Sequence, residues 1–147
     1  MFQALQKVQR NPRHLRNLSE TYPDSDADFL NKLKYLFQRE LPRLDSGLAQ
    51  AASYHFRSSG KAFRAKLAFS SGKALKLPER DSLHWAAACE LLHNASLIHD
   101  DISDASTHRR GQQSINQYFG SDVALCLGDW MVAKAFELGA RNPQHGA

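Results

Sequence analysis

The spacing of apolar residues along the chain predicts five α-helices and no sheet. The first expected helix covers residues 26–41 and carries its apolar side chains on one side, namely Phe29, Leu33, Leu36 and Phe37. Residue types that favour helix N-caps stand at its start, Asp24, Ser25 and Asp26. The other expected helices cover residues 48–56, 62–75, 82–104 and 122–138. No alternating stretch is long enough for a sheet, so we predict an all-α fold.

The helix expected over residues 82–104 has an apolar side and a polar side. At about 100° per residue, His93, Asp100 and Asp104 fall within roughly 40° of one another, with Asp101 just beside them. The opposite side carries apolar residues at helical spacing, namely Leu91, Ala95, Ile98 and Ile102. We therefore expect the apolar side to pack against neighbouring helices and the polar side to carry the function.

Three aspartates close this helix in the pattern D-D-x-x-D: Asp100, Asp101 and Asp104. Two carboxylates this close repel each other by on the order of a few kcal/mol at a protein surface. The C-terminal end of a helix also disfavours negative charge, so a cation is expected among them. Mg²⁺ suits this spacing because it binds one or two carboxylates together with phosphate oxygens and water. Mn²⁺ is the alternative ion, and a solvated acidic face is the alternative interpretation.

Basic residues form two groups around the aspartates. Arg109 and Arg110 follow the aspartates directly, and guanidinium groups are the preferred bidentate partners of phosphate. Lys61 and Arg64 form a second cationic group, for which solubilising surface charge is the alternative. His93 is either a core histidine or, because it shares the aspartate face, a ligand of a neighbouring molecule. Together these residues predict two anion sites, and the one beside the aspartates fits a diphosphate.

Four segments of the sequence together resemble the trans-isoprenyl diphosphate synthases, also called the polyprenyl synthetase family. They are GKAFR at 60–64, ELLHNASLIHDDISD at 90–104, RRG at 109–111 and FGSDVALCLGDWMVAKAFEL at 119–138. The resemblance implies an all-α helical bundle of the isoprenoid synthase type with a deep central cavity. The family's second aspartate-rich motif has no counterpart here, so the chain corresponds to the N-terminal half of that bundle.

The resemblance also implies roles for individual residues. Catalytic aspartates that bind Mg²⁺ on the allylic diphosphate match Asp100, Asp101 and Asp104, and a catalytic arginine on the same diphosphate matches Arg109. The ligands of isopentenyl diphosphate match Lys61, Arg64, His93 and Arg110. The implied reaction is Mg²⁺-assisted ionisation of the allylic diphosphate followed by attack of isopentenyl diphosphate, which lengthens the prenyl chain.

Product length in this family depends on residues about one helical turn before the first aspartate. Here these residues are Ala95 and Ser96, which are both small and favour a product longer than farnesyl diphosphate. Leu92, one turn earlier still, is the candidate for the next layer of the chain cavity.

Composition and charge narrow the remaining possibilities. The 147 residues, 42% of them hydrophobic, are expected to form a single all-α unit over 1–147 with a basic N-terminal segment at 1–23. No apolar run approaches the roughly 18 residues of a spanning helix, so we do not expect an integral membrane protein. Cys89 and Cys126 lack metal-type or redox-type spacing and are expected to be buried thiols in a reducing compartment, the cytoplasm. The net charge of +4 favours anionic partners. The basic residues of the chain flank carboxylates, however, which argues against a nucleic-acid-binding protein.

Three classes of function stay open on the sequence. The first is the N-terminal half of a chain-elongating prenyl diphosphate synthase. The second is a non-catalytic or complementing subunit of a heteromeric or split prenyl diphosphate synthase. The third is a terpene cyclase or squalene synthase-type relative, although GKAFR and RRG argue against it because a cyclase has no second diphosphate substrate. Half a bundle would expose large apolar side chains, so we expect a homodimer or association with a second chain that supplies the missing half; the side chains concerned are Trp85, Phe119, Trp130 and Phe136.

Overall fold

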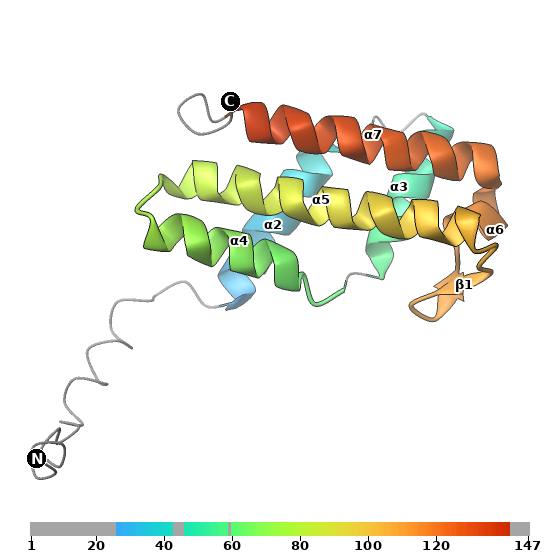
Figure 1. Ribbon diagram of the computed structural model, residues 1–147, viewed down its shortest axis with the longest axis horizontal. Coiled ribbons are helices and arrows are strands. Elements are labelled where there is room, and N and C mark those ends of the chain that lie inside the picture. The colour runs from blue at the N-terminus through green and yellow to red at the C-terminus, as the bar shows by residue number, and fades with distance from the viewer. Residues whose placement is uncertain (1–25, 43–45, 59, 142–147) are drawn as a thin grey trace, which may run out of the picture.

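The computed structural model describes residues 26–42, 46–58 and 60–141 (Figure 1). The elements of this part of the chain are α2 (Asp26–Glu40), α3 (Gly47–Arg57), α4 (Phe63–Ala74), α5 (Glu79–Ser103), β1 (His108–Arg109), β2 (Gln112–Gln113), α6 (Ile115–Phe119) and α7 (Ser121–Ala140). The five predicted helices are confirmed, with each end within three residues of its predicted position. The predicted basic segment at 1–23 and the cap residues Asp24 and Ser25 lie outside the described residues.

Helix α5 is the centre of the arrangement and packs against both α4 and α7. Figure 1 shows these three helices side by side, with α2 and α3 crossing behind them. The predicted apolar side of α5 is confirmed at Leu91, Ala95 and Ile98, which are buried, whereas Ile102 is only half-buried. The buried hydrophobic residues of α7 recur every three or four positions, as a helix packed along one side requires, and they are Ala124, Leu127, Met131, Ala135 and Leu138.

Aromatic contacts join α2 to α3 and to α4. The rings of Phe29 and Phe69 have their centroids 4.6 Å apart and join α2 to α4. Those of Phe37 and Phe56 lie 5.1 Å apart and join α2 to α3. Such pairs add stability beyond their buried area. The predicted apolar side of α2 is therefore confirmed, with Phe37 half-buried at its edge.

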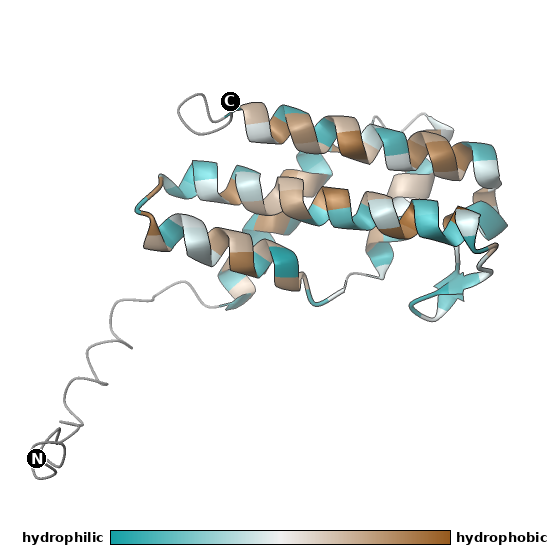
Figure 2. Cartoon of the chain, viewed as in Figure 1, coloured by the Kyte–Doolittle hydropathy of each residue, from teal (hydrophilic) through white to brown (hydrophobic). Residues whose placement is uncertain are grey.

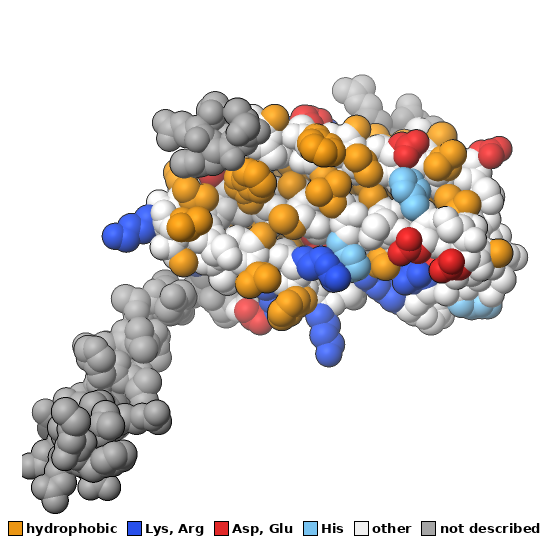
Figure 3. All heavy atoms as spheres, viewed as in Figure 1, with side chains coloured by type: hydrophobic (Ala, Val, Ile, Leu, Met, Phe, Trp, Pro, Cys, Tyr) orange, Lys and Arg blue, Asp and Glu red, His pale blue; other side chains and the backbone are white. Residues whose placement is uncertain are grey.

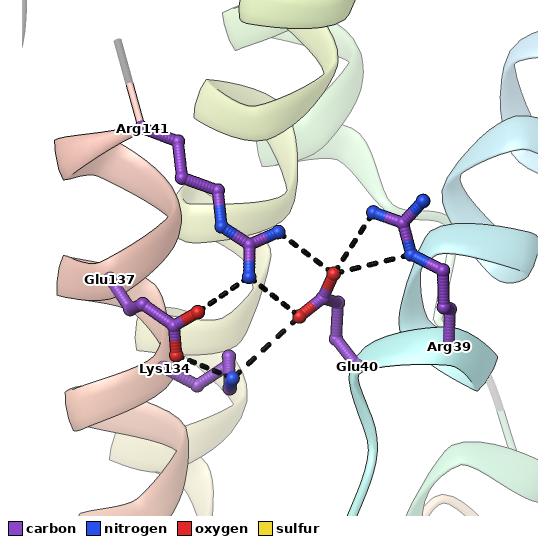
Figure 4. Close-up of polar contacts among 5 residues, drawn as sticks. All are labelled: Arg39, Glu40, Lys134, Glu137 and Arg141. Carbon is purple, nitrogen blue, oxygen red and sulfur yellow. Dashed lines mark hydrogen bonds and ion pairs between the residues drawn. The ribbon is translucent and has the colours of Figure 1, made fainter. Parts of the chain in front are cut away.

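An ion-pair network joins the end of α2 to the end of α7 (Figure 4). The carboxylate of Glu40 accepts hydrogen bonds from Arg141 Nη1 at 2.8 Å and Nη2 at 2.9 Å, and from Arg39 Nη2 at 3.0 Å. Lys134 Nζ lies 3.6 Å from the same carboxylate, and Glu137 binds both Lys134 and Arg141. The hydrogen bonds from Arg141, more than the other cations, lower the pKa of Glu40 from 4.5 to about 2. Residues 101 positions apart in the sequence are thus held together.

The pattern analysis missed two short elements, the β1–β2 hairpin and helix α6. The two central residues of the hairpin turn, Arg110 (φ 52) and Gly111 (φ 78), both have positive φ, which is the backbone of a type I′ turn. Glycine adopts this conformation at no steric cost, but arginine does so under strain. Figure 2 shows that the hairpin and the adjoining end of α5 are largely hydrophilic, unlike the middle of α5 and α7.

Both cysteines were predicted to be buried, and neither is fully buried. Cys126 is exposed because it lies on the side of α7 opposite the buried stripe, so its predicted burial is wrong. Cys89 is half-buried, and burial raises the pKa of its thiol. Among the helices that the structure describes, none combines the length and the apolar character needed to cross a membrane.

The aromatic residues expected to be exposed divide into two groups. Phe136 on α7 is 70% exposed, as expected for a helix face without a neighbour. The other three are half-buried, namely Trp85, Phe119 and Trp130. Phe119 and Trp130 pack against the hydrophobic core.

Candidate functional site

The three aspartates at the end of α5 do not share one environment. Asp100 and Asp104 are exposed, whereas Asp101 is only 2% exposed. The reason is geometric, since successive residues of a helix point about 100° apart and Asp101 turns toward the hairpin. Asp101, predicted to lie beside the polar face, is therefore buried. Two exposed carboxylates remain, one helical turn apart.

Asp101 and Arg109 form a forked ion pair. Arg109 Nε donates to both carboxylate oxygens, at 2.9 and 2.8 Å, and Arg109 Nη2 donates to Oδ1 at 2.7 Å. This hydrogen bonding is the main cause that raises the pKa of Arg109, and the charges of Asp100 and Asp104 act in the same direction. The chain itself thus provides a cation for Asp101.

The two neighbouring arginines of the hairpin contact the ends of different helices. Arg109, on β1, reaches the end of α5, whereas Arg110, in the turn, donates from Nη1 to the Ser58 carbonyl at 3.1 Å. The Arg110 guanidinium also lies against Gly60, in the segment that leads into α4. Arg110 therefore lies beside the segment that leads to Lys61 and Arg64, the second cationic group predicted from the sequence.

The second cationic group is joined to α5 through His93. Arg64 Nη1, at the start of α4, lies 3.2 Å from His93 Nε2. A guanidinium only donates, so Nε2 must accept and the ring proton is on Nδ1. Burial, and secondly the charge of Arg64, lowers the pKa of His93 below its ordinary value. Of the predicted group of Lys61, Arg64 and His93, the structure brings Arg64 and His93 into contact. Lys61 is exposed and lies three residues before Arg64.

A buried polar chain under His93 was missed by the sequence analysis. His55 Nε2 on α3 lies 2.9 Å from Asn94 Oδ1, and Asn94 Nδ2 donates to the Glu90 carbonyl at 2.7 Å. With the amide nitrogen engaged as a donor, its oxygen accepts and His55 Nε2 carries the proton. Burial lowers the pKa of His55. Asn94, a polar residue in the apolar phase of its helix, was the signal available in the sequence.

A second missed group fixes the backbone where α5 ends. Asn116 Nδ2 donates to the carbonyls of Asp101 and Ser106, both at 3.2 Å. The Ser106 amide also donates to the Asp101 carbonyl, at 2.9 Å, and the Ser114 hydroxyl donates to the Ser106 carbonyl at 2.6 Å. The bonds to Asp101 satisfy a carbonyl that a helix end leaves without a partner, and those to Ser106 fix the loop that follows. They hold the aspartates in place relative to α6.

The three residues predicted to set chain length lie on two different sides of α5. Ala95 is buried in the core. Ser96 and Leu92 are exposed, and the Ser96 hydroxyl donates to the His93 carbonyl at 2.8 Å. Within the described chain, Ser96 and Leu92 are therefore available to a bound molecule and Ala95 is not.

A cavity of about 530 Å³ lies between α2, α3 and α5. Its wall contains Arg110 and Gly60 at one end and the aromatic rings of Phe37 and Phe56 elsewhere. Asn94, from the buried polar chain, also lines it. Its volume is in the range of ligand pockets. Of the predicted site residues, Arg110 borders this cavity.

The exposed carboxylates fit a magnesium ion better than a protein-only metal cage. Within residues 26–42, 46–58 and 60–141, no three His, Cys, Asp or Glu side chains gather as a metal site. Mg²⁺, however, keeps several waters and is bound through one or two carboxylates plus substrate phosphates. Asp100 and Asp104, exposed and one turn apart, match that requirement.

Sequence comparisons match most of the chain to one described family. The sequence model of a family described as polyprenyl synthetase matches residues 45–146. The chain is 34% identical over 121 residues to a geranylgeranyl pyrophosphate synthase of Geoglobus acetivorans, a match that covers 82% of this chain and 37% of that protein. It is also 34% identical over 137 residues to the chloroplastic solanesyl diphosphate synthase 2 of Arabidopsis thaliana, covering 89% of this chain and 32% of that protein.

Solved structures give the same picture for the fold. A heptaprenyl diphosphate synthase from Staphylococcus aureus superposes with a TM-score of 0.72 at 26% identity, covering 78% of this chain and 37% of that one. The geranylgeranyl pyrophosphate synthetase of Geoglobus acetivorans superposes with a TM-score of 0.69 at 31% identity, covering 77% and 37%. The chain thus spans about a third of the length of the curated relatives it matches.

Proposed function

The chain belongs to the polyprenyl synthetase family, and from that premise we propose that it supplies the first aspartate motif of a trans-prenyltransferase. The proposed reaction condenses isopentenyl diphosphate with an allylic diphosphate. One observation carries the proposal: Asp100 and Asp104 are exposed at the end of α5, and the hairpin that follows holds Arg109 on Asp101 of the same helix end and Arg110 on Ser58 after α3. Carboxylates for a metal ion and guanidinium groups for phosphate are thus present at one end of the molecule.

Asp100 and Asp104 are the proposed principal ligands of Mg²⁺. Their exposure leaves coordination positions for phosphate oxygens and water. When bound, the ion supplies positive charge that stabilises a leaving diphosphate. Asp101 is proposed as a third ligand on the strength of its match to the family's motif, although without substrate it binds Arg109.

The cationic side chains are assigned to the two substrates. Arg109 is proposed to bind the allylic diphosphate, and the group formed by Lys61, Arg64, His93 and Arg110 is proposed to bind isopentenyl diphosphate. The Arg64–His93 bond supports this assignment, because it holds a guanidinium in place with a neutral acceptor and leaves its charge uncompensated.

The chemistry needs charge stabilisation and positioning, and no protein nucleophile. The allylic C–O bond breaks, and pyrophosphate leaves with the bonding electrons. The double bond of isopentenyl diphosphate then forms the new C–C bond to the allylic cation, and the loss of a proton restores a double bond. Fixed guanidinium groups lower the barrier of the first step because they stabilise the charge on the leaving group. Ser96 and Leu92 are proposed to contact the growing chain.

We further propose that a second chain covers the face shown in Figure 3, by supplying the helices that correspond to the rest of the relatives' length. Hydrophobic side chains lie over α4, α5 and α7 on this face. Exposed large side chains of these helices include Phe63 (71%), Leu67, Leu92 and Phe136 (70%). Apolar patches of this kind mark interaction surfaces in soluble proteins. A complementing subunit, active only with its partner, is accordingly the second candidate function.

The free thiols of Cys89 and Cys126 support a location in the reducing cytoplasm, which we include in the proposal.

Calorimetry of the chain with Mg²⁺ and an allylic diphosphate tests the metal and substrate assignment. We expect binding that requires both components, and a loss of at least about tenfold in affinity for Asp100→Asn and Asp104→Asn, which remove one metal ligand each. Asp122→Asn is the matched control, because it removes an exposed carboxylate from the first turn of α7. No Mg²⁺-dependent binding, or equal affinities for all three variants, would refute the assignment.

Activity and association need a second experiment. The chain is incubated with labelled isopentenyl diphosphate, an allylic primer and Mg²⁺, with and without a polypeptide that carries a second D-D-x-x-D motif. A prenyl product only in the mixture, together with a heavier sedimenting species, supports the complementing subunit. A product from the chain alone, sedimenting as a dimer, supports the homodimer instead, and cyclic hydrocarbon from primer alone would identify a cyclase.

A further inference from the structure

Helices α5 and α7 approach each other closely where His99 lies on Gly128. A Cβ atom placed on Gly128 would be 2.1 Å from His99 Nε2 and 2.6 Å from His99 Cδ2. Atoms that are not bonded to each other do not come this close, so any side chain at position 128 has to displace the imidazole. Gly128 is itself buried in the contact between the two helices. The imidazole therefore occupies the space that a side chain at 128 would need.

Asp129 borders the same imidazole from the next position of α7. Its Oδ1 lies 3.4 Å from His99 Nε2, and its side chain is 69% exposed, whereas that of His99 is 35% exposed. The Nε2 atom is buried and makes no hydrogen bond to any of the described residues. The ring is therefore held by the shape of the surface formed by Gly128 and Asp129 rather than by a directional bond.

The contact is adjacent in the sequence to the proposed metal ligands. His99 directly precedes Asp100, and the Ser103 hydroxyl donates to the His99 carbonyl at 3.0 Å, within the same last turn of α5. Side chains of a helix point in fixed directions relative to one another, about 100° apart for neighbours. If the His99 ring is fixed against α7, rotation of α5 about its axis is fixed at that point as well. A fixed rotation of α5 also fixes the directions in which the side chains of Asp100 and, one turn later, Asp104 point.

We propose that His99 and Gly128 form a positioning contact that sets the direction of the Asp100 and Asp104 carboxylates. Neither residue touches metal or substrate in this role, and the inference rests on the proposed function of the two aspartates. It explains why position 128 carries the residue without a side chain, although glycine inside a helix is less stable than alanine.

Gly128→Ala tests the contact, with Gly139→Ala as its matched control. Both substitutions add one methyl group to α7, but no atom lies within 4 Å of a Cβ at position 139. The readout is the Mg²⁺ concentration that gives half-maximal binding of an allylic diphosphate, measured by calorimetry well below the melting temperature found by circular dichroism. We expect this concentration to rise by roughly tenfold or more in Gly128→Ala, because small misplacements of functional groups have large effects. Gly139→Ala should leave it unchanged.

A double variant separates positioning from general damage. In His99→Ala/Gly128→Ala the ring is gone, and the added methyl group has room. Because the two positions are in contact, their effects should not add. We expect the Mg²⁺ requirement of the double variant to return to within about threefold of that of His99→Ala alone.

Each outcome decides between the possibilities. Folded Gly128→Ala with the wild-type Mg²⁺ requirement, or a double variant in which the effects of the two single substitutions multiply, would overturn the inference. If Gly128→Ala does not fold, His99→Ala and His99→Gln replace it, and a wild-type requirement in His99→Ala overturns the inference. Loss of binding in Asp100→Asn but not in Gly128→Ala would refute the positioning contact and leave the proposed function intact. Absence of Mg²⁺-dependent binding in the wild-type chain removes the proposed function and this inference together.

Discussion

Replacing Glu40 by glutamine tests how strongly the end of α2 is tied to α7. The glutamate carboxylate is 11% exposed and accepts hydrogen bonds from Arg141 and Arg39, with Lys134 nearby (Figure 4). Glu40→Gln keeps the size of the side chain but removes its charge. Three cations then remain around a neutral group.

The size of the effect follows from the pKa of Glu40, which is about 2 in the folded chain and 4.5 ordinarily. At about 1.36 kcal/mol per pKa unit, the difference corresponds to roughly 3 kcal/mol. The partner cations stand partly in water, with Arg141 32% and Arg39 57% exposed, and solvent screening reduces the effect. We expect Glu40→Gln to lower the free energy of unfolding by about 1–2 kcal/mol at pH 7.

Urea denaturation at several pH values measures this contribution. A carboxylate whose folded pKa is depressed stabilises the fold above its unfolded pKa, and the stabilisation is lost as the pH falls toward the folded value. The free-energy difference between wild type and Glu40→Gln should therefore be constant from pH 7 to about 5. It should fall between pH 4.5 and about 2, the two pKa values of Glu40, to less than half at pH 3.

Glu137→Gln is the control within the same network. Glu137 binds Lys134 and Arg141 as well, but its side chain is 48% exposed, so its loss should cost less than about 0.5–1 kcal/mol. Equal costs for the two variants would contradict the reasoning. So would a wild-type-to-Glu40→Gln difference that is the same at pH 7 and at pH 3.

Three other measurements test separate parts of the structure. A thiol reagent should modify exposed Cys126 faster than Cys89 at neutral pH, since burial raises the pKa of the Cys89 thiol, and Cys126→Ser should leave only the slow phase, which accelerates as the pH rises. In NMR titrations, Arg64→Met should raise the pKa of His93, because the charge of Arg64 contributes to lowering it. Leu127→Ala should lower the free energy of unfolding by about 2–5 kcal/mol in urea, because Leu127 is fully buried in α7; a loss under about 1 kcal/mol would place that residue outside the core.

The helices could be predicted because their signals are local. Apolar residues three and four positions apart, such as Phe29 and Leu33, mark a buried helix side without knowledge of what covers it. Helix α6 covers only Ile115–Phe119, which is too short for a period to be visible. The hairpin strands have two residues each and were missed for the same reason, although Gly111 marked the turn.

The candidate site was predicted in its residues but only partly in its geometry. The spacing of Asp100 and Asp104 fixes their common direction, because both lie on one helix. The partner of Asp101 depends on how the following hairpin folds back, which no local pattern contains. The surroundings of Cys126 depend on which side of α7 faces the rest of the chain. An outward side with apolar residues on it, such as Leu125 and Phe136, resembles a buried one in the sequence.

The β1–β2 hairpin restricts the length of its own segment. Surface connections usually tolerate inserted or deleted residues, because closing a slightly longer loop costs little. Here one additional residue between Arg109 and Arg110 would alter the two-residue turn and draw one guanidinium away from its helix, either from Asp101 on α5 or from Ser58 after α3. Engineered linkers, tags or permuted termini should therefore be directed to the connection between α4 and α5 and kept out of residues 105–113.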